Sequence, residues 1–287
     1  MVSPLRRFGV ERALLLAGGE EAARTWKGAQ VNDVLEIAGK RFKSRLMLGT
    51  GKWRNLEEML GAFEASETEI ITVAIRRLDL DDPTKRTLLD DIDWNRYTIL
   101  PNTAGCYTVD EAVRIARLGR EVTGSDWVKL EVIGDQKYLL PDNEGTLEAA
   151  RRLVRENFAV LPYIADDPIL ARKLQEVGTV TVMPLGSPIG SGQGMPHFER
   201  IRIIVEQARV PVVVDAGLGV PSDASMALEI GADAVLVNTA IAKAARPAQM
   251  AEAFKHGVLG GRNAFLAGRI PKLPFAEASS PLTGIVR

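Results

Sequence analysis

The sequence predicts an α/β protein that folds as a (β/α)8 TIM barrel, with an N-terminal hairpin plug and an extra N-terminal extension. After residue 43, eight short apolar runs rich in Val, Ile and Leu alternate with helical patterns. Strands that alternate with helices pair in parallel through right-handed crossovers. Eight such units in about 240 residues match a closed barrel. An open doubly wound sheet is the alternative, but no run is followed by a GxGxxG turn.

The eight runs define the predicted barrel strands in chain order. They are RLMLGTG (45–51), EIITVAI (69–75), TILPNTAG (98–105), WVKLEVIGD (127–135), AVLPYIAD (159–166), TVTVMPLGS (179–187), PVVVDAGLG (211–219) and AVLVNTAIA (234–242). Start and stop signals mark helices between them. Thr108 and Glu111 have the spacing of a capping box. Asp167 suits an N-cap, Pro168 a first helical turn and Gly178 a helix end.

Three segments fall outside this pattern. The segment VLEIAGKRF (34–42) predicts a hairpin that turns at Gly39-Lys40 and plugs the barrel from beneath. Residues 1–32 show weak helical character and form an extension to which the sequence assigns no role. Residues 33–287 then form one barrel domain, and Pro and Ser punctuation predicts a C-terminal tail or flap from about residue 271.

Composition excludes several classes of protein. The 287 residues carry a formal net charge of −1, so no nucleic-acid or membrane partner is expected. No apolar run approaches the roughly 18 residues that span a bilayer. Cys106 is the only cysteine, which excludes an internal disulfide and favours a reducing, cytoplasmic setting. His197 and His256 are far apart in the chain, so no metal or cofactor is expected, although a carboxylate-only magnesium site stays open.

The segment DWVKLEVIGD places two opposite charges on one face of the fourth predicted strand. Strand residues alternate between faces, so Lys129 and Glu131 share one face. Val128, Leu130 and Val132 share the other, which suits the helix-facing side of a barrel. The charged pair should therefore point into the barrel, near the strand's C-terminal half, where barrel active sites lie. A solvated edge strand explains VKLEV alone, but strands in a parallel series have no wet face.

Burial of this pair suggests a chemical use. A buried ammonium or carboxylate without a partner is costly, so we expect Lys129 either to pair with an opposite charge or to have a shifted pKa. Desolvation lowers the pKa of a lysine toward neutrality. The neutral amine can then attack a carbonyl group. A neighbouring carboxylate such as Glu131 can move protons while a carbinolamine and an imine form. The pair therefore predicts Schiff-base chemistry.

Glycine-rich loops after the last three predicted strands suggest a phosphate site. Loops after strands seven and eight of a barrel often bind phosphate through backbone N–H groups. Glycine also lets the backbone approach an anion closely. One such loop is equally well explained as a tight connection, but three consecutive loops favour a phosphorylated ligand. The residues in these loops are Gly186, Gly190, Gly192 and Gly194 after the sixth strand, Ala216, Gly217 and Gly219 after Asp215 at the end of the seventh, and Asn238, Thr239 and Ala240 at the end of the eighth.

Other reactive side chains have simpler explanations. Cys106 could be a thiol nucleophile, but a small buried residue is the favoured interpretation. Arg76 and Arg77 end the second predicted strand, where one could reach a phosphate or both could be solvated. His197, beside a proline, is interpreted as a loop residue.

Seven segments together resemble bacterial thiazole synthase over about residues 33–287. The most specific are LGTGKW, PNTAGC, DWVKLEVIGD, LLPD, VMPLGSPIGSGQG, VVVDAGLG and VLVNTAIA. The resemblance implies a (β/α)8 barrel that makes the thiazole phosphate half of thiamine. The implied substrates are 1-deoxy-D-xylulose 5-phosphate, dehydroglycine, and the thiocarboxylate of a ubiquitin-like sulfur-carrier protein.

The resemblance also implies residue roles and partners. By position in the motifs, Lys129 forms the imine, and Glu131 and Asp215 transfer protons. The sugar-phosphate contacts fall on Gly190, Ala216, Gly217, Asn238 and Thr239. Implied partners are the sulfur carrier, a dehydroglycine-producing enzyme, and identical subunits in a homotetramer. Residues 1–32 precede the usual family start and inherit no role.

Two other functions stay open at this stage. A class I aldolase or a pyridoxal 5′-phosphate synthase-like lyase also needs a strand lysine and a phosphate site. A non-catalytic phosphate-binding barrel would use the glycine loops alone.

Overall fold

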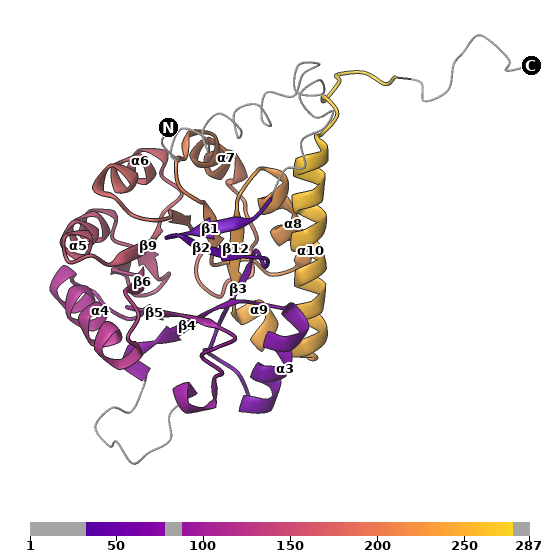
Figure 1. Cartoon of the computed structure of the whole chain (residues 1–287). Helices are drawn as coiled ribbons and strands as arrows, with labels where there is room; N and C mark the ends of the chain where they lie inside the picture. The colour runs from indigo at the N-terminus through magenta and orange to yellow at the C-terminus, as the bar shows by residue number, and fades with distance from the viewer. Residues whose placement is uncertain (1–32, 78–87, 278–287) are drawn as a thin grey trace, which may run out of the picture.

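Eight parallel strands form the centre of the molecule. The computed structural model describes residues 33–77 and 88–277 (Figure 1). The barrel strands are β3 (Leu46–Gly49), β4 (Ile70–Ala74), β5 (Thr98–Asn102), β6 (Trp127–Leu130), β9 (Ala159–Ile164), β10 (Met183–Pro184), β11 (Val213–Asp215) and β12 (Ala234–Val237). The hydrogen-bonded order is β10-β9-β6-β5-β4-β3-β12-β11.

The sheet closes between its two end strands, β10 and β11. Isolated parallel bridges join Val182 to Val212 and Leu185 to Asp215. The backbone N–H of Val213 donates to the carbonyl of Val182 at 3.0 Å, which continues the ladder across the gap. The predicted (β/α)8 barrel is therefore confirmed, and the open sheet is wrong.

Helices surround the strands (Figure 1). They are α3 (Leu56–Ser66), α4 (Val109–Thr123), α5 (Asn143–Arg155), α6 (Pro168–Val177), α7 (Phe198–Gln207), α8 (Pro221–Glu229), α9 (Thr239–Ala242) and α10 (Pro247–Ala267). Thr108 caps α4 by accepting from the Glu111 N–H, and Asp167 caps α6, as predicted. Between β4 and β5 the described residues contain only two 3₁₀ turns, Ile75–Arg77 and Leu88–Asp91, so the helix expected there is not found in them.

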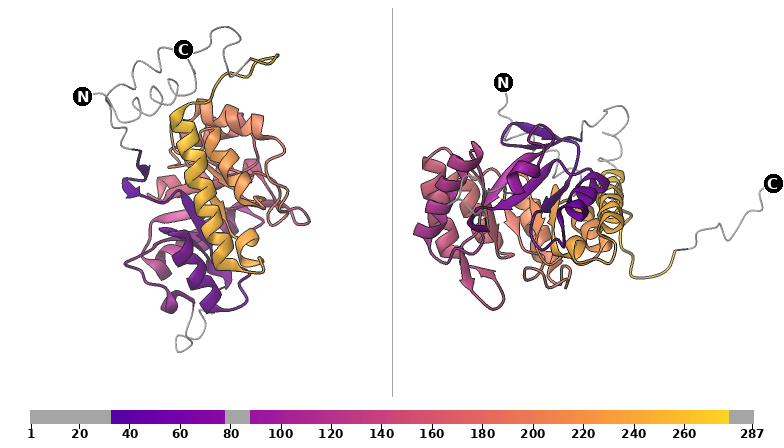
Figure 2. Two further views of the ribbon diagram at one scale, coloured as in Figure 1. Left: turned by 90° about the vertical axis from the view of Figure 1, so that its right-hand side faces the viewer. Right: turned by 90° about the horizontal axis from the view of Figure 1, so that it is seen from below.

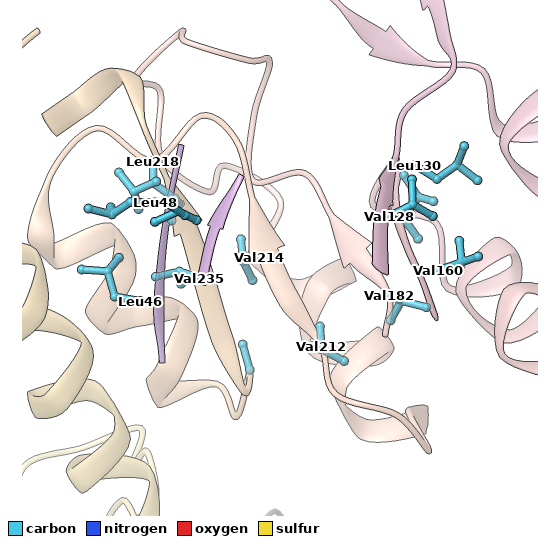
Figure 3. Close-up of a cluster of buried hydrophobic side chains, with 14 of the residues drawn as sticks. Leu46, Leu48, Val128, Leu130, Val160, Val182, Val212, Val214, Leu218 and Val235 are labelled. Atoms are coloured by element: carbon cyan, nitrogen blue, oxygen red, sulfur yellow. The ribbon is translucent and has the colours of Figure 1, made fainter. Parts of the chain in front are cut away.

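The two faces of the barrel wall bury different residues. The outward face packs against the helices and carries aliphatic side chains, including Val128, Leu130 and Val160 (Figure 3). The alternation predicted for the fourth strand is therefore confirmed. Its inward side chains, Trp127 and Lys129, lie inside the barrel at different heights.

A hairpin plugs the end of the barrel where the strands begin. It consists of β1 (Leu35–Ile37) and β2 (Lys40–Phe42), which pair antiparallel. Leu35, Ile37 and Phe42 share a buried cluster with Trp127, and the Phe42 and Trp127 rings meet edge-on at 5.9 Å. Figure 2 shows the hairpin in indigo across this end of the barrel. The plug is confirmed, but the turn lies at Ala38-Gly39, both with positive φ, one residue earlier than predicted.

Several predicted strands end earlier than their apolar runs. The run 127–135 divides, because Ile133–Asp135 (β7) leaves the barrel and pairs antiparallel with Leu140–Pro141 (β8). The run 234–242 stops at Val237, and Thr239–Ala242 is the short helix α9. In each case the apolar run continues into the loop that lines the open end of the barrel.

The described part of the chain ends with helix α10 and a short segment after it. Helix α10 packs along α3 and α8, and residues 268–277 follow it as an exposed segment. The extension 1–32 and the last residues of the predicted tail lie outside the described residues. In residues 33–77 and 88–277, no helix has both the length and the apolarity to span a membrane.

Candidate active site

A cavity of about 980 Å³ opens at the C-terminal end of the barrel. It lies at the end opposite the hairpin plug, and its walls are residues at or just beyond the ends of β3, β4, β5, β6, β10, β11 and β12. Active sites of barrel enzymes form at this end, because the loops after the strands converge there. Of the residues that the structure describes, Lys52, Lys129, Glu131 and Asp215 are its charged lining residues.

Lys129 lies between two carboxylates at the base of this cavity. Its Nζ is 2.7 Å from Asp215 Oδ2 and 3.1 Å from Glu131 Oε1. The three side chains are only 7%, 6% and 3% exposed for Lys129, Glu131 and Asp215, respectively. The structure therefore brings together the three residues that the sequence nominated for catalysis, from strand β6 and its end and from strand β11.

The ionisation of this cluster follows from its charge pairing. Burial by itself lowers the pKa of the Lys129 amine, but the charges of Asp215 and Glu131 and their hydrogen bonds raise it above its usual value. Of the two outcomes expected for Lys129, pairing is the one found, and the pKa does not move toward neutrality. Burial also raises the pKa of the Asp215 carboxyl, although the nearby ammonium of Lys129 partly offsets this. Lys129 is therefore held as an ammonium beside a carboxyl group that is unusually ready to take a proton.

Glu131 lies just beyond the end of β6, where no neighbouring strand continues the ladder to hold it. Its backbone is instead held by Thr103, whose Oγ1 accepts from the Glu131 N–H and donates to the Glu131 carbonyl, both at 2.7 Å. The Thr103 N–H also donates to the Lys129 carbonyl at 3.1 Å. Sequence reasoning assigned no role to Thr103, although it lies within the PNTAGC segment.

All five predicted phosphate-binding residues line the same cavity. Gly190 comes from the loop after β10, Ala216 and Gly217 from the end of β11, and Asn238 and Thr239 from the end of β12. Three of them have left-handed backbone angles, with φ of 73° at Gly190, 68° at Ala216 and 75° at Gly217. Successive turns of this kind expose backbone N–H groups to a concave surface, which suits an anion.

Close packing leaves no room for a side chain at Gly217. A methyl group there would overlap Ser187 Oγ and lie 2.5 Å from the Ser187 carbonyl oxygen. Ser187 is buried, and its hydroxyl donates to the Gly217 carbonyl at 3.2 Å. The loops after β10 and β11 are thereby joined at the cavity wall.

The other reactive side chains that the sequence raised lie outside the cavity lining. Cys106 is fully buried, and burial raises the pKa of its thiol, which agrees with a small core residue. Arg76 is exposed and donates to the Gly105 carbonyl. His197 precedes α7 without a side-chain capping bond, in agreement with a loop residue. Within the described part of the chain, no group of three or more His, Cys, Asp or Glu side chains could hold a metal ion.

Comparisons with known proteins agree with this geometry. The family model described as "Thiazole biosynthesis protein ThiG" matches residues 36–281. A thiazole synthase of Synechococcus sp. is 58% identical over 260 residues, covering 88% of this chain and 94% of that protein. One of Geobacter sp. is 56% identical over 257 residues, covering 90% of this chain and 99% of that protein. Among solved structures, a chain of the Amycolatopsis orientalis BexX/CysO complex is similar, with a TM-score of 0.76 and 32% identity over 84% of this chain and 98% of that one.

Proposed function

Because the chain belongs to the thiazole synthase (ThiG) family of thiamine biosynthesis, we propose that it makes thiazole phosphate from three substrates. These are 1-deoxy-D-xylulose 5-phosphate, dehydroglycine and the thiocarboxylate of a sulfur-carrier protein. The observation that carries this proposal is the buried contact of Lys129 with Asp215 and Glu131 inside a cavity lined by glycine-rich loops.

The first step is imine formation on Lys129. The ammonium must lose a proton before its nitrogen can attack the ketone of the sugar phosphate. Asp215 is the proposed acceptor, because it lies 2.7 Å away and burial raises its pKa. Addition followed by loss of water then gives the imine, with Glu131 or Asp215 returning the proton to the departing oxygen.

The imine makes a carbon of the sugar reactive toward sulfur. It acidifies the neighbouring C–H, and a carboxylate of the pair removes that proton, so that the carbonyl moves one carbon along the chain. The sulfur of the carrier thiocarboxylate adds to that carbonyl carbon. The carrier acyl group then moves from sulfur to the oxygen of that former carbonyl and leaves with it as a carboxylate, so that the sulfur stays on the sugar. The sulfur adds to the C=N carbon of dehydroglycine, whose nitrogen displaces the Lys129 amine from the imine carbon and closes the ring, and loss of water completes the product. Backbone N–H groups near Gly190, Ala216, Gly217, Asn238 and Thr239 hold the phosphate throughout.

The proposal includes protein partners and an assembly. The C-terminal tail of a carrier protein has to enter the open end of the barrel, which is free of the hairpin plug. A related protein of known structure was solved as the BexX/CysO complex, which supports a protein partner for this barrel. We further propose a single catalytic domain over 33–287, a cytoplasmic homotetramer, and a separate enzyme that supplies dehydroglycine.

Reconstitution tests the proposed reaction. The purified protein, deoxyxylulose phosphate, dehydroglycine generated in situ and carrier thiocarboxylate should yield thiazole phosphate, detected by mass spectrometry. Borohydride added with deoxyxylulose phosphate alone should leave a reduced adduct on Lys129, and none in Lys129→Ala. Trapping only with other pentose or triose phosphates would favour an aldolase-type lyase. Full product formation by Lys129→Met would exclude the imine.

A further inference from the structure

Lys52 has a backbone conformation that the local fold does not explain. It lies in the loop between β3 and α3, with φ of 68°. A left-handed conformation is disfavoured for a residue with a Cβ, and functional sites are where such conformations collect. Within residues 33–77 and 88–277, the other non-glycine residues with positive φ lie in hairpin turns, just after helices or in the glycine loops: Ala38, Leu139, Glu67, Asn157 and Ala216.

This conformation accompanies a side chain that reaches the sixth loop. A methyl group placed on Gly190 would lie 3.2 Å from Lys52 Nζ and 3.4 Å from Thr239 Oγ1. The amine of Lys52 is therefore next to two of the residues proposed to bind the phosphate. Lys52 is exposed at the cavity mouth, so its ammonium can meet an entering ligand with little loss of hydration.

The charges that line the cavity favour a further positive group near the phosphate. Lys129 contacts two carboxylates, so that cluster has one positive and two negative charges when all three groups are ionised. A phosphate monoester brings roughly −1.5 to −2 more at neutral pH. Among the described cavity-lining residues, Lys52 supplies the positive charge outside the Lys129 cluster. Its ammonium therefore offsets part of the negative charge that the carboxylates and the phosphate bring together.

We propose that Lys52 is a substrate-binding residue whose ammonium group pairs with the phosphate of the ketose phosphate beside Gly190 and Thr239. This inference rests on the proposed function of the same cavity. It adds a side-chain cation to a site that otherwise uses backbone N–H groups. The pairing holds the phosphate end, so that the ketone end of the sugar is presented to Lys129.

The test compares three variants with the wild-type protein. Lys52→Gln removes the charge and keeps the side-chain length, whereas Lys52→Arg keeps the charge. Lys173→Gln, on the exposed face of α6, is the matched control for loss of one positive charge. The binding of inorganic phosphate and of deoxyxylulose phosphate is measured by calorimetry, and trapping of unphosphorylated 1-deoxy-D-xylulose on Lys129 is measured by mass spectrometry.

Lys52→Gln should weaken binding of both phosphate ligands about 10- to 100-fold and leave trapping of the unphosphorylated sugar unchanged. Lys52→Arg should recover most of the affinity, and Lys173→Gln should match the wild type. Salt should weaken phosphate binding less in Lys52→Gln than in the wild type. Equal phosphate binding by Lys52→Gln and the wild type would overturn the role of Lys52 alone. Failure of the wild type to bind either phosphate ligand would overturn the proposed function as well.

Discussion

The hydroxyl of Thr103 makes two hydrogen bonds to the backbone of Glu131, one to its N–H and one to its carbonyl, each 2.7 Å long. Thr103 is fully buried and belongs to the loop after β5, next to β6 in the barrel. One side chain thus holds the backbone at Glu131, the residue that follows the end of β6. We expect the position of the Glu131 carboxylate relative to Lys129 to depend on these two bonds.

Thr103→Val should lower kcat with little change in KM, because it removes the positioning hydroxyl and keeps the side-chain shape. The expected loss of kcat is about 10- to 100-fold, with a stability loss of about 1 to 3 kcal/mol for the two unpaired backbone groups. Thr103→Ser should restore most of the activity. Steady-state kinetics and urea unfolding measure the two effects.

A matched control separates positioning from stability. Thr68 is also buried, and its hydroxyl lies 2.8 and 3.0 Å from the carbonyls of Leu46 and Ile70, near the plugged end of the barrel. Thr68→Val should lose stability while keeping kcat. If both variants lost kcat in proportion to their stability, Thr103 would have no positioning role.

The pH dependence of imine trapping should respond to Asp215. In the wild type, the charges of Asp215 and Glu131 offset burial and raise the pKa of Lys129, so the free amine is scarce at neutral pH. Its fraction, and the trapping rate with it, should rise about tenfold for each unit of pH. Asp215→Asn removes the larger of the two negative contributions, so the Lys129 pKa should fall and the profile should shift to lower pH.

The measurement is the initial rate of cyanoborohydride trapping from about pH 6 to about pH 9, in both proteins. Loss of Asp215 as a proton acceptor can lower the whole curve, so the shape of the curve is the readout. The wild-type rate should keep rising over the whole range, whereas the Asp215→Asn rate should level off toward its upper end, where the amine is already free. A variant curve as steep as that of the wild type would contradict the coupling between the two residues.

The sequence predicted the parts of this site that depend on strand alternation. Lys129 and Glu131 point inward because Val128 and Leu130 have to face the helices, which local pattern alone reveals. The contact between Lys129 and Asp215 depends on closure of the barrel and is not visible in either segment. For this reason the sequence left pairing and a lowered pKa both open for Lys129: its burial follows from the strand pattern, whereas the second carboxylate comes from a distant strand.

Loop residues were harder to predict than strand residues. The apolar run after Ala234 continues through Ile241, although the chain turns into α9 at Thr239. Thr103 contacts Glu131 from the neighbouring loop, and Lys52 lies next to Gly190 from a loop far away in the chain, which no periodic pattern encodes. In the sequence, each residue is marked only by its place in a segment that resembles the thiazole synthase family, Thr103 in PNTAGC and Lys52 in LGTGKW.

Gly217→Ala should disrupt the cavity more than an equally strained substitution elsewhere. Gly217 and Gly39 both have left-handed φ, 75° and 76°, so at each position the backbone strain caused by an added Cβ costs about 1 kcal/mol. At Gly217 the methyl also overlaps Ser187, which adds about 1 to 3 kcal/mol of strain, whereas nothing lies within 4 Å at Gly39.

Calorimetry with inorganic phosphate and urea unfolding distinguish the two sites. Gly217→Ala should lose phosphate affinity and stability together, and Gly39→Ala should lose a little stability and keep the affinity. Unchanged phosphate binding in a folded Gly217→Ala protein would count against an anion site at this turn.

Asp33 joins the start of the barrel domain to its last helix, and its removal should destabilise the fold. Its carboxylate contacts Arg262 Nη2 at 2.5 Å, on α10, and Arg45 Nη2 at 2.7 Å, just before β3. The arginines are 13% and 7% exposed, so solvent screens these pairs little. Asp33→Asn removes the negative charge that both guanidinium groups contact, and we expect a loss of about 2 to 4 kcal/mol at pH 7.

The pH dependence of this loss has a defined sign. Burial raises the pKa of Asp33, but hydrogen bonds and charges of Arg262 and Arg45 outweigh it and lower the pKa below 3.8. A carboxyl group with a depressed folded pKa stabilises the protein above its unfolded pKa, and this contribution disappears as the pH falls through the folded value. The difference in unfolding free energy between wild type and Asp33→Asn should therefore be constant near pH 7 and shrink below about pH 4.

Asp126→Asn, which removes an exposed ion pair with Arg120, should cost under about 0.5 kcal/mol at either pH. A pH-independent difference for Asp33→Asn would show that the carboxylate charge contributes nothing and that only its shape is needed.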